Sequence, residues 1–268
     1  MVFVIKFDGR KEEFQKEKII RTCLRVGVSD EDARAIAGRI ESSVKDGMTT
    51  QEIYQNILKE LRIVEKKSAV AYSVREMIAH IDPEIFELFV KKLLEAYGYQ
   101  CEYSKLVEGL CVEHQVDIIA KKDGDDLVEC KRHSNPHRFC GLGTCLQVQA
   151  RLEDIRDGFA SGKNKENFRS AWIITNTKFS EHAKRYAQAK QIMLTGWNFP
   201  YEASFASMID EKKFYPVSAL SAKKPVICAL FSHSLVTIHD ISEKSLAEAG
   251  LEQKAAKSLL DQKKKLLG

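Results

Sequence analysis

The sequence predicts a multi-domain protein: a small β-hairpin followed by helices, then an α/β domain with a mixed sheet, then a mostly helical C-terminal segment. The first observation is length, because 268 residues exceed what one hydrophobic core usually holds in a mixed fold. The second is that apolar residues change from helical spacing to strand-like runs at about residue 99. The third is the return of helical spacing after Pro200. We therefore expect domains at residues 1–82, 83–200 and 201–268.

Composition excludes several classes of protein without identifying one. The chain has 42 Lys and Arg against 38 Asp and Glu, so DNA binding cannot be inferred from bulk charge and requires a local patch or motif. With 44% hydrophobic and 30% charged residues, the chain is typical of folded soluble proteins. Seven irregularly spaced cysteines indicate a reduced, cytoplasmic protein. No apolar run reaches 18 residues, so no membrane span is expected.

The first segment opens with a hairpin signal. Apolar residues from Val2 to Phe7 lead into Asp8-Gly9, a pair that tolerates the positive φ of a tight turn. Ser29 is a predicted N-cap and Gly47 a predicted helix stop. Helices are expected at residues 16–25, 30–45, 50–61 and about 67–80.

The second segment begins at Pro83, which suits a first helical turn, and its entry helix should end at Gly98. Asp123-Gly124-Asp125 is the expected turn between two strands. Strands are predicted at residues 99–104, 115–120, 127–131, 171–175 and 192–194, and helices at 147–157 and 180–190. In the third segment we expect helices at 242–249 and 253–267 and a strand-like run at 226–231.

The most specific chemical signal is Asp117 with Glu129 and Lys131. Alternate residues of a strand share a face, so Glu129 and Lys131 project together, and the hairpin lays Asp117 beside them. Two close carboxylates repel unless a cation lies between them, and oxygen ligands suit Mg²⁺. A neighbouring lysine would position a water that attacks a phosphodiester.

A plainer interpretation is that these charges form a solvated strand face with cross-strand pairs. The flanking residues argue against it, because Val116, Ile118 and Leu127 are typical of buried strands.

Longer motifs surround this triad: Phe86-Glu87 on the entry helix, Tyr97-Gly98-Tyr99 at its end, Val116-Asp117-Ile118, Val128-Glu129-Cys130-Lys131, and the strand Trp172 to Asn176. In these motifs the segment resembles the PD-(D/E)XK endonuclease superfamily and, within it, the Mrr-like restriction endonucleases. Val116 stands where the superfamily name has Pro.

The resemblance implies a DNA endonuclease with Asp117, Glu129 and Lys131 as its catalytic residues. Asp117 and Glu129 would hold Mg²⁺ or Mn²⁺, and Glu87 would assist at the metal. A Gln on the following helix would also contribute, and both Gln147 and Gln149 fit that position. Glu113 shares strand parity with Asp117 and is either a rim charge, which we favour, or an additional ligand.

Soft ligands cluster just after the triad, at Cys130, His133, His137, Cys140 and Cys145. Thiolates and imidazoles bind zinc, but this spacing matches no common zinc motif. The alternative, which we favour, is a basic patch formed by Lys131, Arg132, His133, His137 and Arg138 that approaches DNA phosphates.

In the first segment, Lys6, Lys16, Lys18 and Arg21 form either a basic cup for phosphates or a charged amphipathic surface. Val4 to Arg10, Glu13-Phe14, Lys18-Ile19, Thr49 to Ile53 and Tyr72 to Arg75 resemble an ATP-cone, a nucleotide-sensing module of ribonucleotide reductases and their repressors. Phe7 stands where that pattern has Arg, which implies weaker phosphate binding. The resemblance implies that Lys6, Lys18, Thr50 and Arg75 bind ATP or dATP as an effector. No P-loop is present, and hydrolysis of the nucleotide is left open.

Residues 235–267 are faintly similar to a helix-hairpin-helix, which leaves DNA contact or simple packing open for this segment. The combined prediction is a metal-dependent DNA endonuclease that takes ATP or dATP as a regulatory input. Two alternatives stay open: a DNA-binding protein with an inactive nuclease fold, and a nucleotide-responsive regulator that binds DNA as a homo-oligomer.

Overall fold

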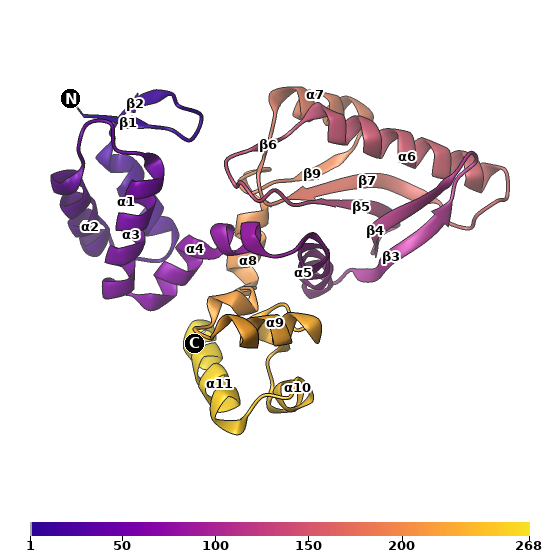
Figure 1. Ribbon diagram of the computed structural model, residues 1–268. Coiled ribbons are helices and arrows are strands. Elements are labelled where there is room, and N and C mark those ends of the chain that lie inside the picture. Colours follow the sequence, from indigo (N-terminus) through magenta and orange to yellow (C-terminus); the bar gives the residue numbers. More distant parts are fainter. Residues whose placement is uncertain (1) are drawn as a thin grey trace. The chain divides into compact units, whose positions relative to one another are not determined.

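The computed structural model describes residues 2–268. Contacts divide the chain into two compact units, Met1–Val74 and Arg75–Gly268, and the division falls within helix α4 (Lys66–His80). Figure 1 shows the elements of both units. Within the described residues, no helix combines the length and apolarity that crossing a membrane would require.

The first unit is the predicted hairpin followed by helices. Strands β1 (Phe3–Ile5) and β2 (Lys11–Glu13) pair antiparallel. The helices are α1 (Lys16–Arg25), α2 (Asp30–Ser43), α3 (Thr50–Val64) and the first part of α4. Ser29 accepts the Asp32 amide at the start of α2, and Thr49 forms a capping box with Glu52 at the start of α3. The hairpin and the four helices are confirmed.

The second unit is built on a five-stranded mixed sheet in the order β3-β4-β5-β7-β9. The strands β3, β4 and β5 pair antiparallel, while β5, β7 and β9 pair parallel. Their bounds are β3 Gln100–Glu108, β4 Glu113–Lys121, β5 Asp125–Lys131, β7 Phe168–Thr175 and β9 Met193–Thr195. The predicted mixed sheet and the β4–β5 hairpin are therefore confirmed.

Helices cover both faces of this sheet (Figure 1). Helices α6 (Leu142–Ala160) and α7 (Glu181–Lys190) pack on one face, and α5 (Pro83–Ala96) contacts β3, β4 and β5. The core on the α6 face includes Val148 and Leu152 from the helix and Leu127 and Ile173 from the sheet. A small parallel pair, β6 (Phe139–Cys140) with β8 (Lys178–Phe179), was not predicted.

The C-terminal segment is helical, as predicted. Phe205 in its first helix is fully buried and makes edge-to-face contacts with Phe86 and Phe89 of α5, at ring-centroid distances of 5.8 and 6.1 Å. The segment contains α8 (Phe205–Lys212), α9 (Lys224–Ser232), α10 (Glu243–Glu248) and α11 (Gln253–Leu267), with 3₁₀ turns at Val217–Ala219 and Ile238–Asp240.

One predicted element is wrong. The strand-like run at 226–231 lies inside helix α9. A short apolar run has no period that separates a buried strand from a buried helix, and here Pro225 occupies the first helical turn.

Candidate active site and nucleotide pocket

Asp117 and Glu129 meet where the β4–β5 ladder ends. The last printed pair of that ladder is Ile118 with Val128, so the next step along the two strands places Asp117 opposite Glu129. The Asp117 Oδ2 atom accepts the backbone N–H of Cys130 at 2.7 Å. Burial, and then the charge of Glu129, raise the pKa of Asp117 to about 6. This carboxylate therefore lies in an acidic, poorly hydrated environment.

Glu87 adds a third carboxylate from helix α5. Burial, and then the charge of Asp117, raise the pKa of Glu87 to about 7. The Tyr103 hydroxyl donates to Glu87 Oε2 at 3.4 Å. The structure thus brings Glu87 into the electrostatic neighbourhood of Asp117 and Glu129, although it comes from a separate helix.

Helix α6 supplies the Arg151 side chain to this site and carries the predicted Gln149. Arg151 Nη1 donates to Glu129 Oε2 at 2.5 Å, a contact that sequence reasoning missed. Gln149 is buried and its Nε2 atom donates to Glu153 at 2.7 Å, while its buried Oε1 atom has no partner among the described residues. Gln147 is exposed. The sequence did hold a signal for Arg151, because it is a charged residue next to the positions of α6 that pack on the sheet.

Lys131 is the last residue of β5 and shares a face with Glu129. Its backbone carbonyl accepts the Thr175 hydroxyl at 2.6 Å, which fixes the strand end. Glu113 is exposed at the first residue of β4, four positions before Asp117. Strand parity therefore places Asp117, Glu129 and Lys131 on one face of β4 and β5, just beyond the last pair of their ladder.

The donor chemistry of this site fits a hard divalent cation. Within residues 2–268, no three His, Cys, Asp or Glu side chains are assembled closely enough to hold a metal by themselves. Mg²⁺ does not require such a set, because it is usually held by one or two carboxylates and keeps several waters. The raised pKa values of Asp117 and Glu87 identify a place where a positive charge would relieve repulsion.

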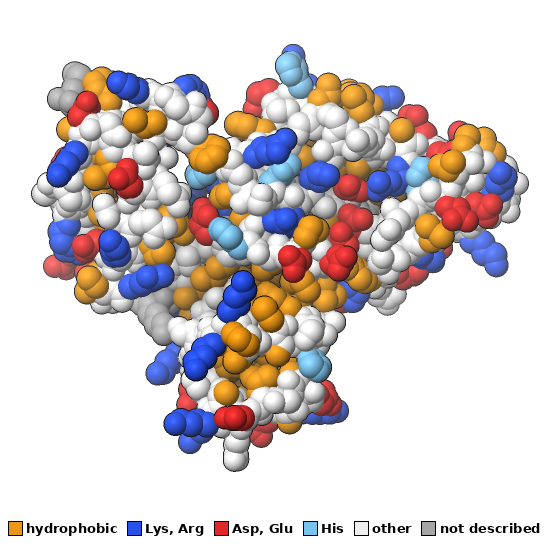
Figure 2. Space-filling view, viewed as in Figure 1, with side chains coloured by type: hydrophobic (Ala, Val, Ile, Leu, Met, Phe, Trp, Pro, Cys, Tyr) orange, Lys and Arg blue, Asp and Glu red, His pale blue; other side chains and the backbone are white. Residues whose placement is uncertain are grey.

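The Cys and His cluster does not assemble into a metal site in the part of the chain that the structure describes. Burial and the nearby carboxylates raise the pKa of the Cys130 thiol. Burial, together with Arg138 and Lys131, lowers the pKa of His133. Of the predicted basic patch, His137 and Arg138 are exposed, and Arg132 donates to the backbone of α4. On the face in Figure 2, basic and acidic side chains are interspersed.

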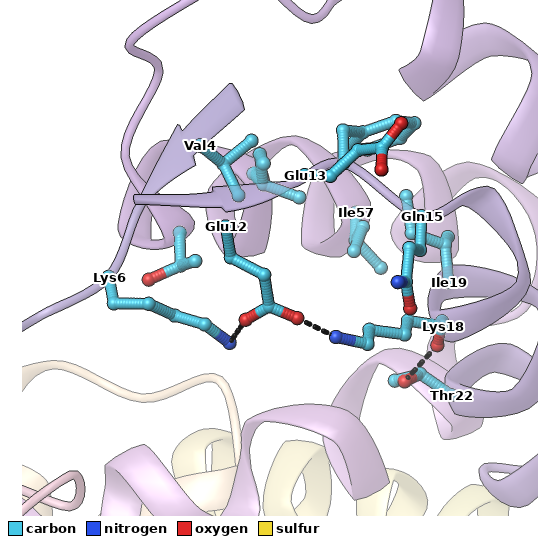
Figure 3. A pocket seen from close by; sticks show the side chains of 12 residues that line it. Val4, Lys6, Glu12, Glu13, Gln15, Lys18, Ile19, Thr22 and Ile57 are labelled. Atoms are coloured by element: carbon cyan, nitrogen blue, oxygen red, sulfur yellow. Dashed lines mark hydrogen bonds and ion pairs between the residues drawn. The ribbon is translucent and has the colours of Figure 1, made fainter. Parts of the chain in front are cut away.

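A second site lies in the first unit. A pocket of about 160 Å³ is lined by Lys6, Lys18 and Thr50 together with apolar side chains that include Ile19 and Ile53. Figure 3 shows the Glu12 carboxylate between the two lysines. It pairs with Lys6 at 2.5 Å and also with Lys18, and these two cations lower the pKa of Glu12 to about 2. This contact of Glu12 was not predicted from the sequence, because it depends on how β2 pairs with β1 in the hairpin.

Arg75 lies elsewhere. It is not among the residues that line the pocket of Lys6, Lys18 and Thr50, and it belongs to the second unit. Its guanidinium donates to the backbone carbonyls of Asn176 and Pro136 and lies over the Trp197 ring, 5.6 Å from the centroid. Three of the four predicted nucleotide-site residues are thus brought together.

The raised pKa of Asp117 predicts that, without a bound metal, the ionised carboxylate lowers the free energy of unfolding. The folded state holds this proton more tightly than the unfolded chain, so stability falls as pH rises from about 4 to about 6 and stays reduced above that. A carboxyl whose pKa is raised from its ordinary value to about 6 holds its proton more tightly by about 3 kcal/mol. We expect Asp117→Asn to raise the free energy of unfolding at pH 8 by up to about 3 kcal/mol, measured by urea denaturation in EDTA.

The matched control is Asp123→Asn, an exposed carboxylate in the turn of the same hairpin, which should change little. The gain for Asp117→Asn should shrink as the pH approaches 4. A variant less stable than the wild type at pH 8 would contradict this account of the site.

Comparisons with known proteins agree with this architecture. Residues 78–197 match a family described as restriction endonuclease, the Mrr catalytic domain, and residues 2–79 match the ATP cone domain. An uncharacterized protein of Archaeoglobus fulgidus is 35% identical over 181 residues, which are 66% of this chain and 99% of that protein. A crystal structure of a protein of unknown function aligns with a TM-score of 0.60 and 33% identity, over 70% of this chain and 99% of that one.

The transcriptional repressor NrdR of Caldicellulosiruptor saccharolyticus is 33% identical over 102 residues, 35% of this chain and 65% of the repressor. The chain therefore belongs to the same family as the Archaeoglobus fulgidus protein, and it contains an ATP-cone domain followed by an Mrr-type restriction endonuclease domain.

Proposed function

We propose that the protein is a metal-dependent DNA endonuclease whose ATP-cone domain binds ATP or dATP as a regulatory effector. The observation that carries this proposal is the meeting of Asp117 and Glu129 at the end of the β4–β5 ladder, with Lys131 on the same face. Raised pKa values at Asp117 and at Glu87 support it, because perturbed carboxylates gather at catalytic sites.

In this proposal Asp117 and Glu129 hold Mg²⁺ or Mn²⁺, with Glu87 alongside. When bound, the metal supplies positive charge for the phosphate that is cleaved. The Lys131 ammonium donates hydrogen bonds to the attacking water and to the phosphate oxygens, where negative charge develops. Gln149, whose buried Oε1 atom has no partner among the described residues, is the further polar side chain that we propose for this site. Arg151 is a further cation for the phosphate, since its contact with Glu129 holds it at the site.

The experiment is a cleavage panel. Purified full-length protein is incubated with supercoiled plasmid, branched DNA and single-stranded DNA in Mg²⁺, Mn²⁺ or EDTA, each with and without ATP or dATP. We expect strand cleavage with a divalent metal and none in EDTA. Absence of cleavage on every substrate and under every nucleotide condition would reject the enzyme and favour a DNA-binding protein with a nuclease fold.

Similarity to a transcriptional repressor supports a second candidate, a nucleotide-responsive DNA-binding regulator that acts as a homo-oligomer. Sedimentation with and without ATP or dATP tests it. A mass that is unchanged by either nucleotide, together with no effect on DNA binding, would reject the regulator.

For the nucleotide pocket we propose that Lys6 and Lys18 bind phosphates and that Thr50 and the apolar wall complete the site. Each of Lys6→Ala and Lys18→Ala should weaken ATP binding about tenfold or more in isothermal titration calorimetry, since a hydrogen bond to a charged group contributes about 1.5 to 3 kcal/mol. The control is Lys16→Ala, on the same helix but paired with Glu41 and outside the pocket lining. Equal affinity for all four proteins would place the nucleotide elsewhere.

A further inference from the structure

The residues that follow strand β5 are held by side chains at the end of strand β7. Asn176 is fully buried. Its Oδ1 atom accepts the His133 N–H at 2.8 Å, and its Nδ2 atom donates to the His133 carbonyl at 2.8 Å. The preceding residue, Thr175, donates to the Lys131 carbonyl at 2.6 Å. The Asn176 amide thus extends the β5–β7 pairing beyond the residue that the proposed chemistry uses.

Helix α4 holds the same segment from another direction. Arg75 donates from Nε to the Asn176 carbonyl at 3.4 Å and from Nη2 to the Pro136 carbonyl. In return, Arg132 Nη1 donates to the Ala79 carbonyl of α4 at 2.7 Å. Buried carbonyls outside regular ladders need such donors. Two guanidinium groups therefore connect the end of α4 with residues 132–136.

All of these contacts lie within the second unit, yet α4 starts at Lys66 in the first. The ATP-cone match also extends to residue 79 and so includes both Arg75 and Ala79. Helix α4 is therefore the last helix of the ATP-cone match, and its last turns also hold residues 132–136, which follow Lys131.

We propose that Arg75 is a positioning residue for the nuclease site, which together with Asn176 orders residues 132–136, directly after Lys131. The inference rests on the proposed function for the role of Lys131. It departs from the assignment of Arg75 to the nucleotide, and the two roles give opposite expectations. If Arg75 binds the nucleotide, its replacement should weaken the affinity for ATP. If Arg75 is a positioning residue, its replacement should instead disorder residues 132–138 and slow cleavage.

The experiment compares full-length wild type, Arg75→Ala, Arg75→Lys and the control Glu76→Ala, which removes a charged side chain from the next position of the same helix. Hydrogen–deuterium exchange is followed by mass spectrometry on peptides that span residues 132–140. We expect Arg75→Ala to exchange about tenfold faster at the His133 amide, the size expected when hydrogen bonds from a charged donor are lost. Arg75→Lys should recover part of the protection, and Glu76→Ala should match the wild type.

Two further measurements complete the test. In DNA cleavage, kcat of Arg75→Ala should fall about tenfold or more while KM stays within about twofold, because a misplaced catalytic group slows the chemical step. The Kd for ATP should stay within about twofold of wild type, because the pocket is not lined by Arg75.

Unchanged exchange in Arg75→Ala would overturn the proposal, as would weakened ATP binding with normal exchange, which would make Arg75 a nucleotide ligand. The exchange measurement does not require cleavage, so a wild type that cuts no DNA rejects the proposed function while exchange still decides whether Arg75 orders the segment. If Arg75→Ala does not fold, Arg75→Lys is compared with wild type: faster exchange supports the proposal and equal exchange overturns it.

Discussion

Lys131→Ala should lose cleavage activity by at least about a hundredfold and up to about ten-thousandfold, the range observed when a group that acts on protons or on developing charge is removed. Lys131 ends β5 on the same face as Glu129, and alanine leaves its backbone contact with Thr175 in place. The fold should therefore persist while the ammonium group is lost. Initial rates of plasmid nicking in Mg²⁺ and in Mn²⁺ measure the effect.

The control for this substitution is Lys122→Ala, an exposed lysine in the turn at the other end of the same hairpin. It should cut DNA like the wild type, whereas Asp117→Asn should be as inactive as Lys131→Ala. Circular dichroism and thermal unfolding confirm that the inactive variants are folded. Wild-type rates in Lys131→Ala would remove Lys131 from the mechanism even if the protein is a nuclease.

Phe205→Ala should destabilise the second unit by about 3 to 5 kcal/mol, the cost of removing a fully buried aromatic side chain. Phe205 is fully buried and contacts Phe86, Phe89 and Trp197, the last at a centroid distance of 6.2 Å. The cavity would lie behind α5, the helix that carries Glu87. Differential scanning calorimetry should show the unfolding transition lower by roughly 6 to 20 °C for a unit of this size.

Tyr201→Ala is the control, because Tyr201 lies four residues earlier and is 92% exposed. It should leave the transition within about 1 or 2 °C, as expected for a surface substitution. A Phe205→Ala transition equal to that of the wild type would mean that α8 contributes little to the packing of α5.

Local signals allowed most of the fold to be predicted. Helix α1 has the predicted bounds, and so does α11, because polar residues and glycines mark helix ends in the sequence. The apolar run at 226–231 is too short to show either a helical or a strand period, and its helical state depends on Pro225 and on packing. Helix α6 begins at Leu142 rather than at residue 147. The sequence does not indicate this start, because the first turn has neither a side-chain cap nor an acidic residue.

The site was predictable only as far as strand parity reaches. Parity and one hairpin turn place Asp117, Glu129 and Lys131 on a common face. They cannot show that Arg151 pairs with Glu129 or that Gln149, rather than Gln147, is buried, because both depend on how α6 lies against the sheet. The contact of Arg75 with Asn176 joins positions 101 residues apart, and no local pattern encodes it.

The acidic surroundings of Cys130 have a consequence for redox chemistry. Thiolates, rather than thiols, react with oxidants and alkylating agents. Burial and the carboxylates of Asp117 and Glu87 keep the Cys130 thiol protonated, so the environment that favours a cation at Asp117 also protects this sulfur from oxidation. Cys130, which lies between two proposed catalytic residues, is therefore held in the less reactive thiol form.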